Sequence, residues 1–433
     1  MTDETELPVV SPAADPTASV PDPEGASVAS EPTVKVWKGD PRVALSKGRA
    51  RPAWAGHPNI YEGAIEKVDG DPADGDEVDV VDSSGRFIGR GVWGGGSALR
   101  VRILRNTRGP VDAAFVARRV RQAVALRRDV LQLGAVTDAW RLIHGDGDRL
   151  PGVVADRYGD WVVLQVTNRP MADRRPALAK ALLDAAGVKG VWERAAPKFA
   201  EREGFHPGGG RLAGETPPDA VVIQEHGLRF SVDLVKGQKT GHFLDQRDNR
   251  LRFGGFTKDR RVLDAFSGTG AFSIAALTQG ATSALALDSS ARVLERAAEN
   301  ATLNDCAERL ESRAGDAFTA LRELEEAGEK FGAVSLDPPR FASSQREVSG
   351  ALRGYLEVNT RGIALVEPGG ILATSSCTGA VSESDFLRML RDAAFRARRR
   401  VQILAVTGQA PDHPWLTAVP EGRYLKHVLA RVL

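Results

Sequence analysis

A single thiol near the carboxyl end of the chain is the first candidate for chemistry. Cys377 is one of two cysteines in 433 residues, and it follows the apolar run ILATSS, where a buried strand is expected to end. Open α/β sheets hold their ligands at the carboxyl ends of strands. A thiolate there can add to an electron-poor ring carbon near neutral pH. A lone cysteine is more often a small buried hydrophobic side chain, which is how we interpret Cys306, so the case for Cys377 depends on the surrounding motifs.

A glycine turn between two apolar strands predicts a cofactor site. The stretch RVLDAFSGTG runs from an apolar strand into a turn and then a helix, and the next apolar strand ends at Asp288. Gly268 and Gly270 let the backbone approach a ligand closely, and an acidic residue about 20 positions further on suits a ribose diol. An ordinary structural turn with incidental acidic residues is the alternative interpretation.

Three further positions favour S-adenosylmethionine over NAD at this turn. Asp264 precedes the turn, Ser273 stands where a dinucleotide fold would carry a third glycine, and Asp316 lies in GDAF after the third strand. S-adenosylmethionine carries no pyrophosphate, so a full phosphate cradle is unnecessary, and a carboxylate near the turn can meet its methionyl ammonium.

A stiff acidic loop follows the fourth apolar strand. In FGAVSLDPPRF, Asp337 comes directly after the strand and is followed by Pro338, Pro339 and then Phe341. Prolines cannot continue a strand ladder and they restrict the loop. A carboxylate beside an aromatic ring can bind the amine edge of a nucleobase and stack on its face. A simple strand-terminating turn is the alternative.

Taken in order, these motifs resemble one family. GQKTGHFLDQRDNR, DAFSGTG, LDPPRF, TSSCTG, DHP and EGRYLK are similar to the motifs of the bacterial RNA methyltransferases that form 5-methylcytosine in large-subunit ribosomal RNA. VALSKGRARPAWAGHPNIYEGAI resembles the start of a PUA domain, a small β-rich RNA-binding module. The resemblance covers residues 34 to 433.

The resemblance implies a role for each matching residue. Cys377 would attack carbon 6 of cytosine, with thiolate formation favoured by nearby backbone amides and by the cofactor's positive charge, and Asp337 would hold the cytosine at N3 and its amino group. The base that removes the hydrogen on carbon 5 is not identified. The implied cofactor contacts are Gln246, Asp264, Phe266, Ser267, Gly268, Thr269, Gly270, Asp288 and Asp316. The implied substrate contacts are Pro338, Pro339, Phe341, Lys47, Arg49 and Arg51.

One departure keeps other functions open. Many RNA cytosine carbon-5 methyltransferases carry a second cysteine just after the proline of the Asp-Pro loop, and this chain has Arg340 there. The loop also resembles those of methyltransferases that act on a ring or exocyclic nitrogen of a purine, which need no cysteine. A third possibility is an RNA-binding ribosome-assembly factor that has lost activity, although the thiol and the cofactor acids are all present.

Charge and composition agree with an RNA partner. The whole chain has a formal net charge of +1, but residues 1–34 contain seven acidic and no basic residues, so the remainder carries +8. Basic residues cluster at Lys35 to Arg51, Arg118 to Arg128 and Arg396 to Arg400. Only the first cluster, which overlaps the PUA-like segment, is predicted to bind RNA, because charge runs on helices are usually solvated faces.

Several other residues could serve a site or the core. Trp37, Trp54 and Trp93 could stack on bases or fill the barrel core, and His242 could line the cofactor site. No metal spacing is present among the histidines and cysteines. No disulfide framework, signal peptide or membrane span is predicted, which suits a reducing cytoplasm; a homodimer is compatible with the family.

We expect four segments. Residues 1–33 form an acidic, disordered leader; 34–106 a small β-barrel PUA domain; 107–226 a linker helix and a central α+β domain; and 227–433 a doubly wound, Rossmann-like class I methyltransferase domain. A hairpin is expected to turn at Tyr158 to Asp160, and the glycine-rich stretch from Gly208 to Pro218 is predicted to be a loop.

Overall fold

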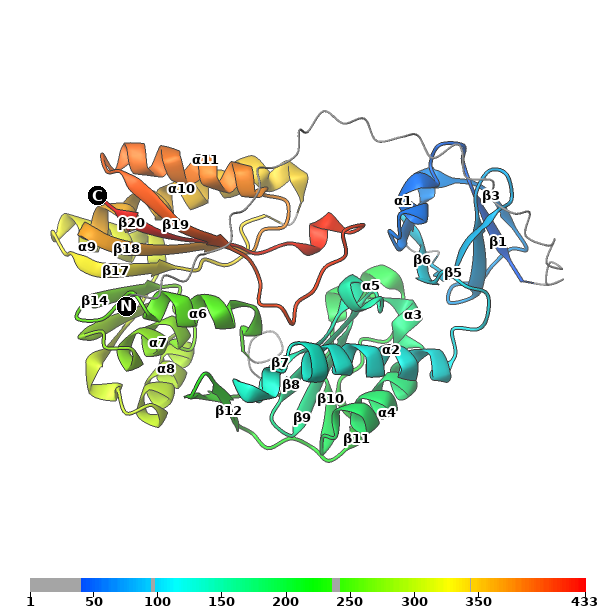
Figure 1. Cartoon of the computed structure of the whole chain (residues 1–433), viewed down its shortest axis with the longest axis horizontal. Coiled ribbons are helices and arrows are strands. Elements are labelled where there is room, and N and C mark those ends of the chain that lie inside the picture. The colour runs from blue at the N-terminus through cyan, green and yellow to red at the C-terminus, as the bar shows by residue number, and fades with distance from the viewer. Residues whose placement is uncertain (1–39, 95–97, 236–241, 343) are drawn as a thin grey trace, which may run out of the picture. The chain divides into compact units, whose positions relative to one another are not determined.

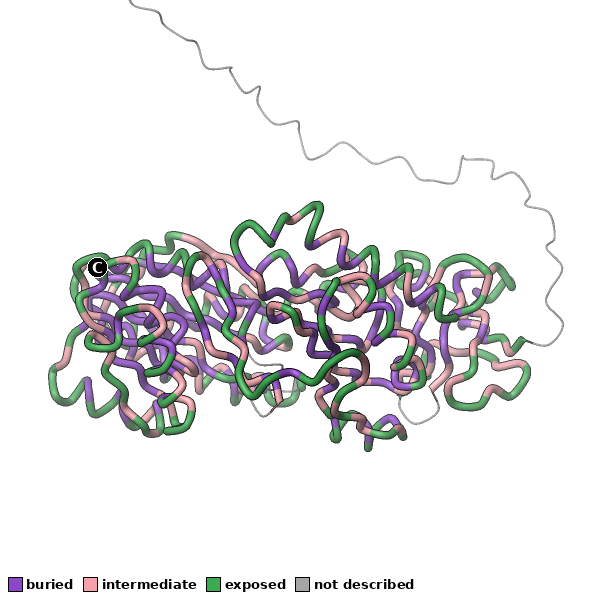
Figure 2. Tube along the Cα trace, turned by 90° about the horizontal axis from the view of Figure 1, so that it is seen from below, coloured by how far each residue is buried: buried purple, intermediate pink, exposed green. Residues whose placement is uncertain are grey.

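The computed structural model describes residues 40–94, 98–235, 242–342 and 344–433. Predictions for the leader (1–33) and Trp37 therefore fall outside the described residues. Figure 2 shows that buried residues lie mainly in the interior and exposed ones mainly in the outer turns. Within the described ranges, no helix combines the length and apolar character needed to cross a membrane.

The N-terminal part is a six-stranded sheet with the order β2-β6-β5-β4-β1-β3, antiparallel except for the β1–β4 pair. Alternate side chains such as Val43, Leu45, Val78 and Val80 fill its core. Its elements are β1 (Arg42–Leu45), α1 (Arg51–Trp54), β2 (Asn59–Tyr61), β3 (Ile65–Asp69), β4 (Glu77–Val81), β5 (Phe87–Trp93) and β6 (Leu99–Arg105).

The middle part has a five-stranded sheet with the order β11-β10-β9-β8-β7. Its elements are α2 (Ala113–Ala125), β7 (Ala139–His144), β8 (Val153–Tyr158), β9 (Trp161–Val166), α3 (Arg169–Ala172), α4 (Arg175–Ala186), β10 (Gly190–Glu193), α5 (Pro197–Glu203) and β11 (Gly210–Gly214). The predicted hairpin at Tyr158 is confirmed, because Tyr158 pairs with Trp161 across a two-residue turn.

One prediction for this region is wrong. Gly210–Gly214 is strand β11, which pairs with β10 at the edge of the sheet, rather than part of a loop. Glycine is a poor strand former, but at Gly190 a side chain would come within 2.2 Å of the Glu215 carbonyl oxygen. Because Gly190 on β10 has no side chain, Gly210–Gly214 can pair closely with β10 and join the sheet.

A two-stranded hairpin, β12 (Val221–Glu225) with β13 (Leu228–Val232), follows the middle sheet. Ile223 and Phe230, one from each strand, pack in the core beneath the C-terminal sheet. The predicted boundary at residue 226 falls inside this hairpin; the domain boundaries themselves stay predictions.

The C-terminal part is a seven-stranded sheet with the order β16-β15-β14-β17-β18-β20-β19, parallel except for β20. Its elements are α6 (Arg247–Gly254), β14 (Arg261–Ala265), α7 (Ala271–Thr278), β15 (Ser283–Asp288), α8 (Ala291–Leu303), β16 (Leu310–Ala314), α9 (Ala317–Glu326), β17 (Phe331–Leu336), α10 (Val348–Leu365), β18 (Val366–Ser376), α11 (Glu383–Arg396), β19 (Val401–Thr407) and β20 (Lys426–Val432). The expected doubly wound sheet is confirmed.

Helices cover both faces of this sheet (Figure 1). Leu263, Val334 and Leu372 point to the layer formed by α9, α10 and α11, while their neighbours Val262, Ala333 and Ile371 point to the layer formed by α6, α7 and α8. Strands buried on both faces read as continuous apolar runs. The strand order reverses between β14 and β17, and this switch point is where such sheets bind ligands.

Candidate active site

The glycine turn after β14 has the backbone that its sequence predicts. Phe266, Gly268 and Gly270 all have positive φ angles, of 62°, 53° and 77°. A β-carbon on Gly270 would lie 2.9 Å from that of Ala297, so this glycine allows helix α7 to begin close to α8. A bulky residue such as Phe266 seldom adopts positive φ, and such strain is typical of ligand sites. The turn is further held by the amide of Asn300, which donates to the Thr269 carbonyl at 3.1 Å.

Asp264 lies under this turn with a fully buried side chain. Its Oδ2 accepts hydrogen bonds from the backbone N–H and the hydroxyl of Ser273, at 3.0 and 2.8 Å. Its Oδ1 and the hydroxyl of Ser267 have no hydrogen-bond partner in the described part of the chain. Burial raises the pKa of Asp264 to about 7, and the charge of Asp337 adds to this against the hydrogen bonds from Ser273. A buried acceptor without a partner fits the ammonium group of a methionyl cofactor.

Two more acidic residues follow the neighbouring strands at the same edge. Asp288 ends β15, and its carboxylate accepts the N–H groups of Gly268 and Ser290, both at 3.0 Å. Asp316 is exposed and caps α9 by accepting the N–H of Thr319 at 2.9 Å. A carboxylate has about four lone-pair positions, so both residues retain acceptor capacity for the hydroxyl or amine groups of a cofactor.

The acidic loop after β17 lies across the switch point from the glycine turn. Asp264 pairs in register with Ser335 on β17, two residues before Asp337. Oδ1 of Asp337 accepts a hydrogen bond from the Gln246 side-chain amide at 2.9 Å. Pro338 is buried and Pro339 exposed, whereas the ring of Phe341 packs on Tyr355 of α10 with centroids 4.7 Å apart. The loop is therefore anchored on both sides of its carboxylate.

Gln246 links this loop to the strand that carries the thiol. Its side-chain N–H group also donates to the hydroxyl of Ser375 at 3.0 Å, and its oxygen accepts from Asn249 at 2.7 Å. The hydroxyl of Ser375 in turn contacts Nδ1 of His427 at 2.9 Å. The structure thus places Gln246 against Asp337; its contact with the cofactor stays a prediction.

Cys377 directly follows β18 and is half-buried, as expected for a residue at the end of a buried strand. Strands β17 and β18 are parallel neighbours, with Leu336 paired to Thr374. Asp337 and Cys377 therefore leave the sheet at the same edge from adjacent strands. The next residue, Thr378, is held by the Tyr355 hydroxyl at 2.8 Å, which fixes the backbone beside the thiol.

The structure brings residues of the EGRYLK segment to the same place, which the sequence did not assign. Tyr424 donates its hydroxyl hydrogen to Asp245 at 2.6 Å, and Nζ of Lys426 donates to the Thr378 carbonyl at 2.6 Å. The resemblance of EGRYLK to a motif of the family was the only signal for them in the sequence, because their partners lie far away along the chain.

Other predicted residues lie elsewhere. Lys47, Arg49 and Arg51 are exposed around the turn between β1 and α1, and no ion pair involves them within the described ranges. His242 is buried against Phe230 and contacts Glu225 and Arg250 instead of presenting an open face.

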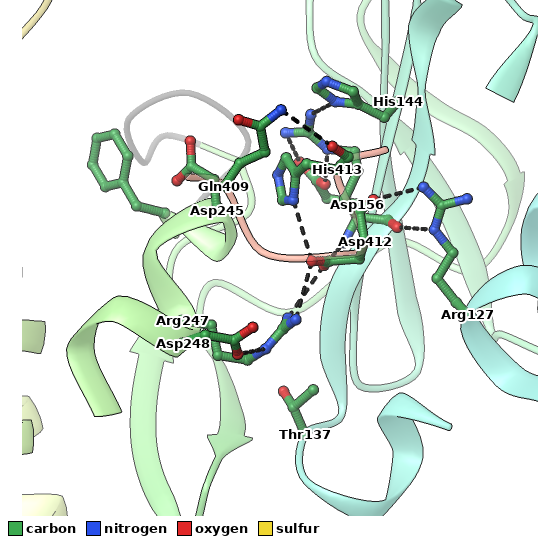
Figure 3. Close-up of polar contacts among 12 residues, drawn as sticks. Arg127, Thr137, His144, Asp156, Asp245, Arg247, Asp248, Gln409, Asp412 and His413 are labelled. Carbon is green, nitrogen blue, oxygen red and sulfur yellow. Dashed lines mark hydrogen bonds and ion pairs between the residues drawn. The ribbon is translucent and has the colours of Figure 1, made fainter. Parts of the chain in front are cut away.

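A buried charge cluster, missed by the sequence reasoning, surrounds Asp412 (Figure 3). Its carboxylate accepts hydrogen bonds from Arg247 at 3.0 and 3.2 Å and from the Arg141 backbone at 2.9 Å, and it lies 3.2 Å from His413. Its carbonyl oxygen accepts from Arg127 at 2.6 Å. Burial alone would raise the pKa of Asp412, but His413 and Arg247 outweigh it and hold this pKa well below its usual range.

This cluster corrects the interpretation of the basic helix segment. Arg127 is fully buried and pairs with Asp148, and Arg119 is almost fully buried, so neither belongs to a solvated face or an RNA-binding patch. A local run of arginines predicts an exposed face because it does not reveal a carboxylate partner 21 residues away.

Comparison with known proteins agrees with this arrangement. The profile of a PUA-like domain matches residues 43–106, and that of an S-adenosylmethionine-dependent methyltransferase matches residues 140–416. Proteins named ribosomal RNA large subunit methyltransferase I from Salmonella arizonae and Salmonella newport are each 38% identical over 91% of this chain and 98% of theirs.

Solved structures show the same fold. A putative methyltransferase complexed with SAH and a putative S-adenosylmethionine-dependent methyltransferase from Streptococcus mutans both superimpose with a TM-score of 0.78. Each is 19% identical in sequence, and the match covers 90% of this chain and 99% of the other.

Proposed function

Because this chain belongs to the S-adenosylmethionine-dependent methyltransferase family that carries a PUA-like domain and includes the ribosomal RNA large subunit methyltransferases I, we propose that it methylates carbon 5 of a cytosine in large-subunit ribosomal RNA. The bound cofactor supplies an electrophilic methyl group. Such a reaction belongs to the cytoplasm, where ribosomal RNA is assembled and modified in bacteria.

The observation that carries the proposal is that Asp337 and Cys377 directly follow two adjacent parallel strands, β17 and β18, at the same edge of the sheet. Carbon 5 of cytosine is a weak nucleophile, whereas a nitrogen has a lone pair of its own. Covalent activation of the base by a thiolate is therefore needed for methyl transfer to carbon 5 and not for transfer to nitrogen. Asp337 beside it offers a carboxylate for the N3 and amino edge of the base, and Phe341 an adjacent ring.

Cys377 and Asp337 have different roles in the proposed reaction. The thiolate of Cys377 would form a bond to carbon 6 and push the ring electrons to carbon 5, which would take the methyl group that the cofactor supplies as the methyl–sulfonium bond breaks and its electrons return to sulfur. Asp337 holds the N3 and amino edge as charge builds up in the ring. The hydrogen on carbon 5 would then pass as a proton to water, its bonding electrons would re-form the ring double bond, and the bond between carbon 6 and sulfur would break to restore the thiolate.

The cofactor contacts carried over from the sequence are part of this proposal. Asp264 would meet the methionyl ammonium with its open Oδ1, and the backbone from Phe266 to Gly270 would enclose the methionyl end. Asp288 would bind the ribose diol and Asp316 the adenine amine. Lys47, Arg49 and Arg51 would contact RNA phosphates, since all three are exposed and cationic.

Nucleoside mass spectrometry of ribosomal RNA from cells with and without the gene tests the product. Loss of one 5-methylcytidine in the large-subunit RNA is expected, restored by the wild-type gene and by Cys306→Ala but not by Cys377→Ala. Loss of a methylated purine with all 5-methylcytidine intact would instead favour transfer to nitrogen. An unchanged set of modified nucleosides, with RNA binding retained, would indicate an inactive assembly factor.

A further inference from the structure

Strand pairing places a lysine beside the thiol. Lys426 is the first residue of β20 and is paired in register with Ser376, the last residue of β18. Cys377 is the next residue along β18's direction. Lys426 is only 4% exposed, so its side chain is confined among the groups around this strand end.

Backbone carbonyl groups hold the ammonium of Lys426 in place. Nζ donates to the carbonyl oxygen of Thr378 at 2.6 Å and to that of Tyr424 at 2.9 Å. Thr378 immediately follows the thiol-bearing residue. No carboxylate lies within 4.0 Å of Nζ among the residues that the structure describes. Carbonyl dipoles orient a buried ammonium but do not neutralise its charge, so among the described residues no carboxylate pairs directly with Lys426.

The other charged groups around Lys426 do not form an ion pair with its ammonium in the described part of the chain. Arg340 and Arg423 are both cationic, and the carboxylate of Glu383 is engaged with Arg423. Burial lowers the pKa of Lys426 to about 8, and the charge of Cys377 opposes this shift. Asp337 leaves the sheet at the same edge as the thiol, and its carboxylate accepts a hydrogen bond from Gln246. Two further titratable neighbours of the thiol in the described part of the chain, Tyr355 and Tyr424, have pKa values raised by burial and are neutral near pH 7.

We propose that Lys426 is a positioning residue that acts through Cys377, its buried ammonium serving as the counter-ion of the thiolate. The thiol proton passes to water, and the ammonium stabilises the charge left on sulfur in a site from which most water is excluded. The inference rests on the proposed function in giving the thiolate a catalytic task, but the ion pair itself can be measured without RNA or cofactor.

Alkylation of a single-thiol protein tests the pair. In a Cys306→Ala background, Cys377 is the only thiol, and its rate of reaction with iodoacetamide can be followed by intact-protein mass spectrometry from pH 5.5 to 9.5. Lys426→Met is expected to move the profile to higher pH and to slow alkylation at pH 7 about tenfold, whereas Lys426→Arg retains most of the rate. A profile that is the same in Lys426→Met would overturn the proposal.

Lys330 provides a matched control. Its Nζ also donates to a backbone carbonyl, that of Ala364 at 2.6 Å, but it precedes β17 and so lies at the opposite edge of the sheet. Lys330→Met should leave the alkylation profile unchanged. An equal shift in both variants would show a general effect of charge or stability and would also overturn the proposal.

The reciprocal experiment does not require a change at the buried lysine. Cys377→Ser keeps the shape of the side chain but cannot ionise near neutral pH, so Lys426 should lose its proton at lower pH than in the wild type. Competitive acetylation with acetic anhydride across pH, read at Lys426 by peptide mass spectrometry, measures this midpoint. An unchanged midpoint would overturn the pair even if Lys426→Met failed to fold.

The two proposals fail in different ways. Methyl transfer that persists in Cys377→Ala would exclude the carbon-5 mechanism, whatever the alkylation profile. Normal alkylation of Lys426→Met, together with loss of activity in Cys377→Ala, would leave the mechanism intact and remove only the role of Lys426.

Discussion

Two fully buried aspartates, Asp264 under the glycine turn and Asp412 in the loop before β20, have opposite surroundings. Asp412 is in contact with Arg247 and His413, and its pKa is held well below the usual range. Asp264 accepts the N–H and O–H groups of Ser273 on one oxygen, its other oxygen has no hydrogen bond among the described residues although the side chain of Ser335 is nearby, and its pKa is raised to about 7.

The difference shows how burial of one residue type can serve either structure or binding. A buried carboxylate with matched cations stays ionised and fastens the segments that carry those cations. A buried carboxylate without a cation takes up a proton or awaits a positively charged ligand. We therefore propose that Asp412 stabilises the fold and that Asp264 binds the cofactor.

The largest expected effect is on stability, in Asp412→Asn. The change keeps the shape of the side chain but leaves the buried guanidinium of Arg247 with only the exposed Asp248 as a counter-ion, so the free energy of unfolding should fall by about 3 kcal/mol. Urea unfolding measures this loss. Asp184→Asn, which removes an exposed ion pair with Lys180, is the control and should change stability little. A similarly small loss in Asp412→Asn would contradict a structural role.

Asp264→Asn should instead weaken the cofactor. Loss of a hydrogen bond between charged groups costs about 1.5–3 kcal/mol, so affinity for S-adenosylmethionine should fall by roughly 10- to 100-fold in calorimetric titration. The unfolding free energy near pH 8 should stay equal or rise, because the variant no longer buries a charge. Unaltered affinity would show that the open Oδ1 does not face the ammonium.

The pH dependence of cofactor binding should follow from the raised pKa of Asp264. Below about pH 7 this carboxyl is protonated in the free protein and must release its proton before it can pair with an ammonium. Affinity should therefore fall as pH drops from 7 to 5.5, by up to about tenfold per unit. Titrations in two buffers of different ionisation enthalpy would detect the released proton. Asp264→Asn should bind with a flat profile, and a flat wild-type profile would exclude this linkage.

The contributions of these two residues to the free energy of unfolding should change with pH in opposite directions. The raised pKa of Asp264 gives stability that is fully present below about pH 4 and lost as pH rises through about 7. The depressed pKa of Asp412 gives stability that is present above about pH 4 and lost as pH falls below it. Thermal unfolding from pH 4 to 8 should therefore show Asp264→Asn gaining stability relative to wild type as pH rises.

The smallest expected effect is at the exposed Asp316, which separates capping from binding. Asp316→Ala should cost about 1 kcal/mol because α9 loses its N-cap, whereas Asp316→Asn keeps the cap. Thermal unfolding measures the first effect. If Asp316 also binds the cofactor's adenine, Asp316→Asn should reduce affinity with stability unchanged; equal affinity in Asp316→Asn and wild type would leave capping as its role.

Much of the candidate site was predictable because its residues lie at strand ends. Asp264, Asp288, Asp337 and Cys377 each end or directly follow an apolar run, and parallel strands bring their carboxyl ends to one edge. Gly268 and Gly270 predicted the turn because few other residues tolerate positive φ. Strand β11 could not be predicted from the sequence, because it depends on pairing with β10, which outweighs the poor strand propensity of glycine.

The sequence by itself determined the order of motifs, the doubly wound sheet and the position of the thiol, since each depends on local patterns and general rules of strand connection. Only the tertiary structure decided which charges meet. Arg127 and Asp412 are 285 residues apart, and Gln246 and Asp337 are 91 residues apart. Lys426 meets the segment of Cys377 only because β20 inserts antiparallel beside β18. No periodicity encodes such partners, because burial and ionisation depend on neighbours that folding alone brings together.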